Sequence, residues 1–326
     1  MDGKPDIIVI GASIGGLVAL RRLFARLPAG LPAAILAVMH IGSRESLLPE
    51  LLAPHSALPV RHARDGDAIA PGTVLIAPPD RHLLVEAGRV GLSHGPKENF
   101  ARPAVDPLFR SAAIAYRRQA IGVILTGNLD DGTVGLQAIK AYGGTAIVQD
   151  PQEAEAPSMP ASAIEHVDVD FCLTLDDIAA TLVRLVDTAL PAQPVSGFAG
   201  SAPLENRFLT QDTGMDELDT IGTHSSLTCP ECHGSLWEIT GADPLRYRCH
   251  TGHAYTARTL AAAQEQMAEE ALWAAVRALH EKRSLLKRCA RQASDSQRAE
   301  AAAEHEAAAE QAARHAEILR KLMGAG

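Results

Sequence analysis

Short apolar runs rich in β-branched residues alternate with segments of helical periodicity over residues 1–190. The first run, Ile7–Ile10, is followed by apolar residues at helical spacing from Leu17 to Leu27. This alternation predicts an α/β fold: a doubly wound, mostly parallel sheet with helices on both faces, in three α/β/α layers. The predicted strands are Ile7–Ile10, Ala34–Val38, Val74–Ala77, Gly122–Leu125, Thr145–Val148 and Asp170–Leu173, and the predicted helices are Gly16–Leu27, Ser46–Leu52, Pro107–Tyr116, Val134–Ala141 and Asp177–Thr188. The stretch His82–Leu92 predicts a small β-hairpin that turns at Glu86-Ala87-Gly88.

The pattern changes after residue 190. Residues 191–226 are rich in Pro, Gly, Ser, Thr and Asp and have no sustained period, so we expect a linker. Residues 227–256 hold three clustered cysteines, and residues 257–326 are rich in Ala, Glu, Arg and Leu. Apolar positions from Leu272 to Ala290 follow a coiled-coil-like spacing, and a break is expected at Ala293-Ser294-Asp295-Ser296. We therefore predict four parts: a domain at 1–190, a linker at 191–226, a small module at 227–256 and an α-helical tail at 257–326, the tail being a helical hairpin or one long bent helix.

Composition narrows the classes of function. The formal net charge of −9, without a long basic block, argues against binding to nucleic acid. No apolar stretch has the roughly 18 residues that a membrane span needs, so we expect a protein that is not membrane-inserted. The N-terminus does not resemble a signal peptide, and five unevenly placed cysteines fit a reduced cytoplasm better than a disulfide framework.

A candidate nucleophile lies at the end of the first predicted strand. Gly11-Ala12-Ser13-Ile14-Gly15 has the form G-x-S-x-G, a turn that exposes a serine hydroxyl. A serine needs a base, and parallel strands place functional residues together at their carboxyl ends. His40 follows the second strand and Asp131 follows the strand that ends at Leu125, which predicts a Ser13–His40–Asp131 triad. Simpler roles remain open: a turn serine, a loop histidine, and an aspartate capping the helix near Val134.

Two better-known sites fit less well. An α/β-hydrolase places its nucleophile after several strands and has the order Ser…Asp…His, whereas Ser13 follows the first strand and His40 precedes Asp131. A dinucleotide site would have glycine in place of Ser13, and an acidic residue is missing near Val38.

The clustered cysteines form a candidate metal site. Cys229, Cys232, Cys249 and His253 have the spacing C-x2-C-x16-C-x3-H, which suits a tetrahedral structural Zn²⁺ in a ribbon-like module. Gly252, directly before His253, favours His253 over His250 as the fourth ligand, and His224 and His233 are weaker candidates. The alternatives are unrelated thiols in a reduced protein or a redox C-x-x-C. No cofactor is expected to take part in catalysis.

The residues around the candidate triad resemble the CheB-type protein-glutamate methylesterases of chemotaxis. The resemblance covers about residues 5–190, and its carriers are Ile10–Gly16, the strand ending in His40, Leu75–His82, Arg102–Phe109, Val123–Gly127, Asp131-Gly132, Gly143–Asp150, Ser158-Met159-Pro160 and Ala163-Ile164. It implies hydrolysis of glutamyl γ-methyl esters, and deamidation of glutamines, on methyl-accepting chemotaxis receptors. A methyltransferase or another signalling protein is a further possible partner. By resemblance Ser13 is the nucleophile, His40 the base and then the acid, and Asp131 the orienting carboxylate.

The chain departs from the family pattern in ways that bear on rate and regulation. We assign Ile14, Asn128 and Arg102 to the oxyanion or the substrate, although the family usually has threonine at Ile14 and methionine at Asn128. Leu129 stands where the family has glycine, so we expect the backbone of this loop to differ. The family's N-terminal receiver domain is missing from the sequence, which suggests a free-standing variant regulated by its C-terminal extension. The alternatives are a weakly active signalling scaffold and a serine hydrolase of another ester.

Overall fold

The computed structural model describes residues 4, 6–86, 88–190, 200–210 and 215–324. Its centre is a seven-stranded sheet in which every pair of neighbouring strands is parallel. The strand order is β3-β4-β2-β1-β7-β8-β9. The strands are β1 (Ile7–Ala12), β2 (Ala34–Met39), β3 (Val60–His62), β4 (Val74–Ile76), β7 (Ala120–Ile124), β8 (Thr145–Gln149) and β9 (Phe171–Leu173).

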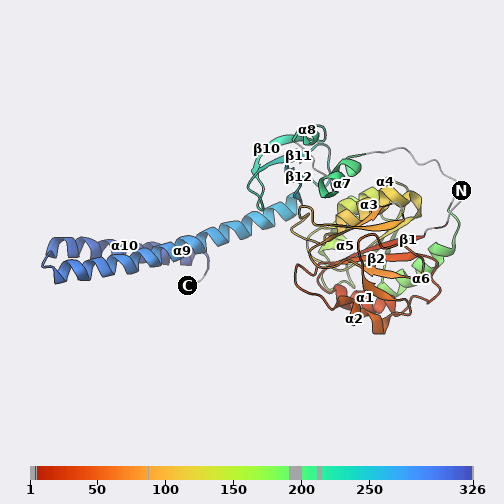
Figure 1. Ribbon diagram of the computed structural model, residues 1–326, viewed down its shortest axis with the longest axis horizontal. Coiled ribbons are helices and arrows are strands. Elements are labelled where there is room, and N and C mark those ends of the chain that lie inside the picture. Colours follow the sequence, from red (N-terminus) through yellow and green to blue (C-terminus); the bar gives the residue numbers. More distant parts are fainter. Residues whose placement is uncertain (1–3, 5, 87, 191–199, 211–214, 325–326) are drawn as a thin grey trace. The chain divides into compact units, whose positions relative to one another are not determined.

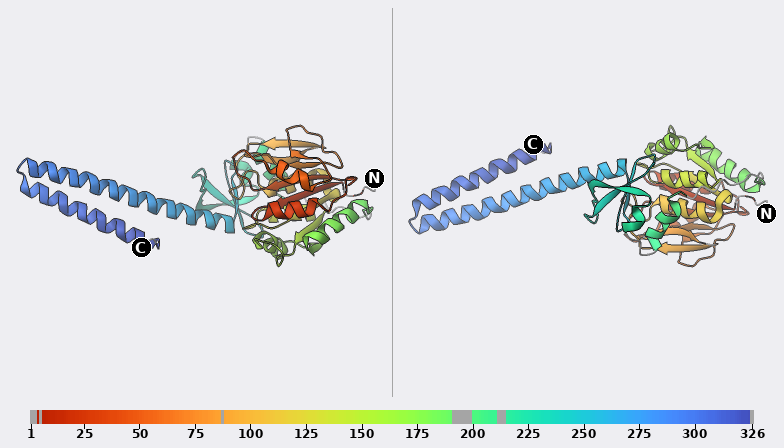
Figure 2. Two further views of the ribbon diagram at one scale, coloured as in Figure 1. Left: turned by 90° about the horizontal axis from the view of Figure 1, so that it is seen from below. Right: turned by 90° about the horizontal axis from the view of Figure 1, so that it is seen from above.

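Helices cover both faces of this sheet, as Figures 1 and 2 show. Alternate residues of the central strands point to opposite faces, so Val9 belongs to one apolar cluster and Ile10 to the other. The first cluster includes side chains of α3 (Val105–Tyr116), α4 (Thr133–Ala141) and α5 (Ser158–His166), and the second those of α1 (Gly16–Phe24), α2 (Leu48–Leu52) and α6 (Leu175–Asp187). The predicted three-layer α/β fold is therefore confirmed.

The chain winds outward from β1 in both directions, which fixes where a site can form. β2 pairs with β1 on one side, and β7 pairs with it on the other. The carboxyl ends of β1, β2 and β7 therefore lie at the topological switch point of the sheet, the usual place for a site in such folds. The predicted hairpin is also present, as β5 (His82–Glu86) and β6 (Arg89–Ser93).

The range predicted as a linker differs from the prediction. Part of it, 191–199 and 211–214, lies outside the described residues, but the rest contains α7 (Ala202–Thr210), α8 (Met215–Leu218) and the start of a strand. The prediction of a linker is wrong for these segments, because Phe208 and Leu209 of α7 are buried and hold this short helix in the core. The frequent Pro, Gly and Ser residues hid this apolar face.

The cysteine-rich module is a four-stranded antiparallel sheet. Its strands are β10 (Gly222–Thr228), β11 (Ser235–Ile239), β12 (Arg246–Cys249) and β13 (Ala254–Thr256), in this order. The sheet begins five residues before the predicted module start at 227, because β10 pairs with β11 from Gly222 onward. It belongs to the same compact unit as the seven-stranded sheet, and this unit extends to Leu260.

The second compact unit, residues 261–326, is helical. It comprises most of α9 (Ala257–Asp295) and all of α10 (Ala299–Leu322), which run antiparallel side by side in Figures 1 and 2. The chain reverses after Asp295, at the predicted break, so the tail is the helical hairpin and not one bent helix. No helix in the described residues is both long and apolar enough to cross a bilayer.

Candidate active site

Ser13 lies in a tight turn between β1 and α1. The strand ends at Ala12, and the helix is preceded by Gly15, whose φ of 76° is in the left-handed region that glycine adopts without strain. A Cβ atom on Gly15 would also come within 2.8 Å of Glu155. The backbone N–H of Ser13 donates to the carbonyl of Thr126, 2.9 Å away, which fixes the turn against the end of β7.

The structure brings the three predicted triad residues together. Nδ1 of His40 lies 3.1 Å from Oγ of Ser13, and Nε2 of His40 lies 2.7 Å from Oδ2 of Asp131. With the hydroxyl donating to Nδ1, the other ring nitrogen carries the hydrogen that Asp131 accepts. The side chain of His40 is 22% exposed, whereas that of Asp131 is 2% exposed. His40 is therefore partly open to solvent, whereas the carboxylate of Asp131 is buried.

Asp131 is stabilised as an anion by the start of α3. Its carboxylate accepts from the N–H groups of Val105 at 2.7 Å and Asp106 at 3.2 Å, the first two residues of that helix. Burial alone would raise the pKa of Asp131. The hydrogen bond from His40 and its charge, together with these N–H donors, outweigh the effect of burial, so the pKa is lowered. The aspartate does not cap α4, the simpler role considered above, because that helix starts after Gly132 and has no side-chain cap.

Asn99 and Asp106 complete the surroundings of Asp131, and sequence reasoning missed both. Nδ2 of Asn99 donates to Asp131 Oδ1 at 3.1 Å and to Asp106 Oδ2 at 2.9 Å. Burial and the nearby charge of Asp131 raise the pKa of Asp106 well above its usual range. The signals in the sequence were weak: Asp106 lies within the stretch Arg102–Phe109 that carries the resemblance, and Asn99 ends a polar run just before it.

The candidate oxyanion residues lie at the turn of Ser13 and in the loop after β7. Ile14 follows Ser13 and is 51% exposed. Leu129 has a φ of 61°, so a leucine occupies the left-handed conformation that glycine would adopt without strain. The hydroxyl of Ser158 donates to the Leu129 carbonyl at 2.9 Å and supports this conformation. Leu129 therefore carries local backbone strain next to Asn128.

Arg102 lines a cavity of about 350 Å³ beside His40. Its Nε donates to Asp80 Oδ1 at 2.9 Å, and its Nη1 donates to the carbonyl of Gly95 at 2.8 Å. The hydrogen bond from Arg102 is the main reason that the pKa of Asp80 is lowered. The guanidinium is thus held in place at the wall of this cavity.

The four predicted metal ligands form one cluster in the module. The ligand atoms of Cys229, Cys232, Cys249 and His253 all lie within 4.8 Å of one another. The Cys232 and Cys249 sulfurs are 3.6 Å apart, and Cys249 Sγ lies 3.5 Å from His253 Nδ1. These separations match the edges of a tetrahedron with Zn–S bonds of about 2.3 Å. The residues therefore fit a structural zinc ion.

Comparison with known proteins decides the family. A family model described as CheB methylesterase matches residues 8–182. The chain belongs to the CheB methylesterase family. A putative protein-glutamate methylesterase/protein-glutamine glutaminase of Leptospira interrogans is 41% identical over 182 residues, which cover 55% of this chain and 94% of the relative. A protein-glutamate methylesterase/protein-glutamine glutaminase of Anaeromyxobacter dehalogenans is 42% identical, over 56% of this chain and 54% of the relative.

A solved structure supports the same assignment. The crystal structure of the Thermotoga maritima CheB methylesterase catalytic domain is 39% identical, has a TM-score of 0.54, and matches 57% of this chain and all of its own. In this CheB-family chain the family match contains all three triad residues and Asn99, whereas the Cys/His cluster and the helical tail lie beyond it.

Proposed function

We propose that this CheB-family protein hydrolyses glutamyl γ-methyl esters, and deamidates glutamines, on methyl-accepting chemotaxis receptors. The observation that carries the proposal is the continuous hydrogen-bonded chain from Ser13 through His40 to Asp131 at the sheet's switch point. A hydroxyl paired with a histidine that is oriented by a buried carboxylate is the arrangement that acyl transfer needs.

The mechanism follows from these contacts. Ser13 Oγ attacks the ester carbonyl carbon while its proton passes to Nδ1 of His40, and Asp131 stabilises the imidazolium through Nε2. The tetrahedral intermediate expels the methoxy group, which takes that proton and leaves as methanol. Water, deprotonated by His40, then attacks the acyl-enzyme and releases the glutamate carboxylate. For a glutamine the leaving group is ammonia, and the other steps are the same.

Two groups are suited to the charge that develops on the carbonyl oxygen. The backbone N–H of Ile14, directly after the nucleophile at the start of a helix, is the first candidate donor, and the loop at Asn128 supplies the second. Arg102, at the edge of the cavity beside His40, is placed to bind the receptor segment around the ester. With these assignments, the receptor segment that carries the ester would bind at the rim formed by the ends of β1 and β2.

Methanol release from a methylated chemoreceptor fragment tests the proposed activity. The wild-type chain should release methanol, and Ser13→Ala should not, while Ser226→Ala, at an exposed position of β10, serves as a matched serine control. Release by both wild type and Ser13→Ala would exclude Ser13 as nucleophile. No release by the wild type would favour a signalling scaffold, and activity on small esters alone would favour a hydrolase of another substrate.

We further propose that the Cys/His cluster binds a structural Zn²⁺. All four positions are filled by protein ligands, so the site leaves no open coordination position for catalysis. Tyr255 supports this assignment, because its hydroxyl lies 3.3 Å from the Cys229 sulfur, where it can donate to a thiolate ligand. Zinc would hold together the β10–β13 sheet, whose apolar cluster is small.

A further inference from the structure

Asn99 makes hydrogen bonds through both the NH₂ group and the carbonyl oxygen of its side-chain amide. The NH₂ group faces the catalytic domain and donates to Asp131 and Asp106. The carbonyl oxygen Oδ1 faces the module, where it accepts from the backbone N–H of Thr256 at 3.3 Å and from the Thr259 hydroxyl at 3.1 Å. All of these residues are buried. One side chain therefore connects the catalytic carboxylate with the C-terminal extension.

The two donors from the extension fix the orientation of this amide. An asparagine amide can turn over and exchange its oxygen and nitrogen, and only its hydrogen-bond partners decide between the two orientations. With Thr256 and Thr259 in place, the oxygen is held away from Asp131. Without them, the turned amide would put an acceptor oxygen against a carboxylate that needs a donor.

The backbone around Asn99 also pairs with the module. The N–H of Asn99 donates to the carbonyl of Ala254 at 2.8 Å, and the N–H of Ala254 donates to the carbonyl of Lys97. The ring of Phe100 packs against Tyr255, with centroids 5.0 Å apart. Ala254 is the first residue of β13 and directly follows His253. A candidate zinc ligand is therefore adjacent in sequence to the residue that accepts from the Asn99 backbone.

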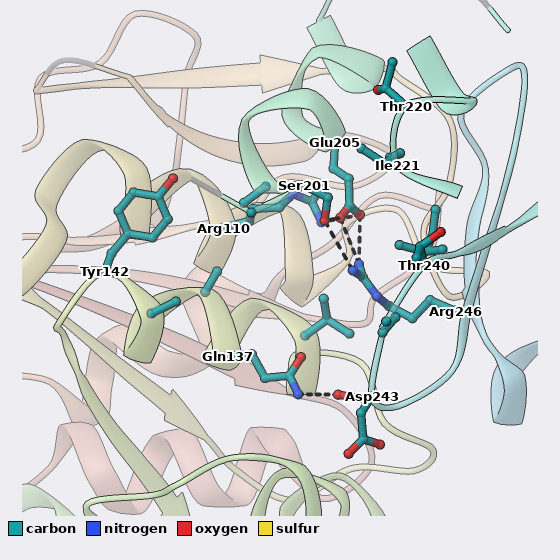
Figure 3. A pocket seen from close by; sticks show the side chains of 18 residues that line it. Arg110, Gln137, Tyr142, Ser201, Glu205, Thr220, Ile221, Thr240, Asp243 and Arg246 are labelled. Atoms are coloured by element: carbon teal, nitrogen blue, oxygen red, sulfur yellow. Dashed lines mark hydrogen bonds and ion pairs between the residues drawn. The ribbon is translucent and has the colours of Figure 1, made fainter. Parts of the chain in front are cut away.

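Buried ion pairs fix the module to the same segment. Nη2 of Arg248, in β12, lies 3.0 Å from Glu98 Oε1 and 2.8 Å from Glu205 Oε2. Glu98 also pairs with Arg110 of α3 at 2.8 Å. Figure 3 shows the neighbouring contact, in which Arg246 of β12 points its guanidinium at Glu205, 3.0 Å away. Moving β12 would leave these buried charges unpaired, so the ion pairs fix β12 against Glu98, whereas the donors to Asn99 come from the neighbouring β13 and from Thr259.

We propose that Asn99 is a positioning residue for the hydrolysis and that the zinc-loaded module acts on Asp131 through it. The inference rests on the proposed esterase function and adds a means of regulating that same site. When the Cys/His cluster is filled, β13 and Thr259 hold the Asn99 amide with its NH₂ group on Asp131. When the cluster loses its metal, these donors are released, Asp131 loses a hydrogen bond, and His40 is less well oriented toward Ser13.

The test compares the full chain with Zn²⁺ and after chelation, using three measurements. They are kcat and KM for methanol release, the rate at which a fluorophosphonate labels Ser13, and amide hydrogen exchange of residues 97–106 and 129–135. Removing zinc from the wild type should lower kcat and the labelling rate about tenfold or more, since small misplacements of catalytic groups have effects of this size. KM should change little, and exchange of both segments should rise.

Substitutions at the link separate this effect from general loss of structure. With zinc bound, Thr259→Val should lower kcat and labelling, whereas Thr259→Ser, which keeps the hydroxyl, should behave as the wild type does. Thr223→Val, on the exposed strand β10, is the matched control. In Asn99→Ala both rates should already be low, and chelation should change them by less than about twofold, because coupled changes are not additive.

Two outcomes would overturn the proposal. One is a wild type whose labelling and kcat stay the same on chelation and on substitution of Thr259. The other is a loss on chelation that is equally large in Asn99→Ala, because the module would then act by another route. Labelling of Ser13 and hydrogen exchange do not require the receptor substrate. If methanol release is absent but these two still respond to zinc, the proposed substrate is wrong and the coupling holds.

Discussion

His40 directs its Nε2 atom, and not Nδ1, at Asp131, with 2.7 Å between Nε2 and Oδ2. The nitrogen nearer the backbone is thereby left for Ser13. The orientation follows from the sheet, because His40 directly follows β2 and Asp131 lies beyond the end of β7, with β1 between these two strands. The carboxylate is held by the start of α3, so the ring has one preferred orientation.

The first prediction concerns Asp131→Asn. The carboxylate accepts from His40, Asn99 and two backbone N–H groups, and an amide would set its own NH₂ against at least one of these donors. We expect kcat for methanol release to fall by about 10³–10⁴-fold, the size seen for such a change in another serine hydrolase, with KM nearly unchanged. Asp130→Asn, at the neighbouring residue, is the control and should keep most of the activity. Equal losses in the two variants would contradict an orienting role.

The second prediction concerns Gly127, in the turn after β7. A Cβ atom there would lie 2.0 Å from the Met159 sulfur and 2.9 Å from Cβ of Ser13. Gly127→Ala should therefore lower the free energy of unfolding by about 1–3 kcal/mol, as overpacking does, and displace the nucleophile. Gly30→Ala, where a Cβ would meet nothing within 4 Å, should be close to neutral. Urea denaturation and Ser13 labelling measure the two effects, and a stable, fully reactive Gly127→Ala would refute the account.

The sequence predicted the positions of the triad residues well but missed some short elements of the fold. The alternation of strands and helices placed Ser13, His40 and Asp131 at the ends of their strands, and parallel pairing brought those ends to one edge. The edge strand β3 was missed, because its three residues, Val60–His62, form too short a segment to show a hydrophobic period. The helix α5 was missed because Pro160 and the small residues around it disguise its pattern.

Contacts between distant segments were beyond reach for a different reason. Asn99 contacts Asp131 and Thr259, which are far from it in sequence and in separate structural elements. Local patterns report which face of an element is apolar, but not which buried polar groups will pair. Glu205 was placed in the predicted linker because its sequence neighbourhood gives no sign of its three arginine partners, which come from α3 and β12.

The third prediction uses the acidity of Glu205. Burial alone would raise its pKa, but the charges of Arg246, Arg248 and Arg110 outweigh burial and hold the pKa well below the usual range. A carboxylate whose pKa is lower in the folded protein than in the unfolded chain stabilises the folded state. This stabilisation is complete at pH values above the unfolded-state pKa of about 4.3, and it is lost as the pH falls to the folded-state pKa. At pH 7, Glu205→Gln should lower the free energy of unfolding by about 3–5 kcal/mol, because it leaves buried guanidinium groups without a charged partner.

The difference in the free energy of unfolding between the wild type and Glu205→Gln should decrease as the pH falls from 7 toward 3. Urea denaturation at several pH values measures it, and Glu317→Gln, on the exposed face of α10, is the control with no expected difference. A difference that is constant with pH would show that the cost of Glu205→Gln comes from packing and not from the charge.

The fourth prediction concerns Arg102, beside the cavity near His40. Arg102→Ala should raise KM for the receptor substrate by about tenfold, the effect of losing one hydrogen bond to a charged group, with a smaller change in kcat. Arg61→Ala, which removes an exposed arginine paired with Asp67, is the matched control. If Arg102→Ala lowers kcat and leaves KM unchanged, Arg102 stabilises the transition state, and its assignment to substrate binding is wrong.

The last prediction concerns the metal. Purified without chelators, the wild type should contain about one zinc per chain, and Cys232→Ser should contain far less, because a serine oxygen is a poor replacement for a thiolate in a Cys₃His site. Cys289→Ser, on α9 outside the cluster, is the matched control and should keep its zinc. Because zinc requires deprotonated ligands, its affinity should fall as the pH is lowered. Zinc-free wild type, or equal zinc in Cys232→Ser and Cys289→Ser, would show that the four ligands lie together without binding this metal.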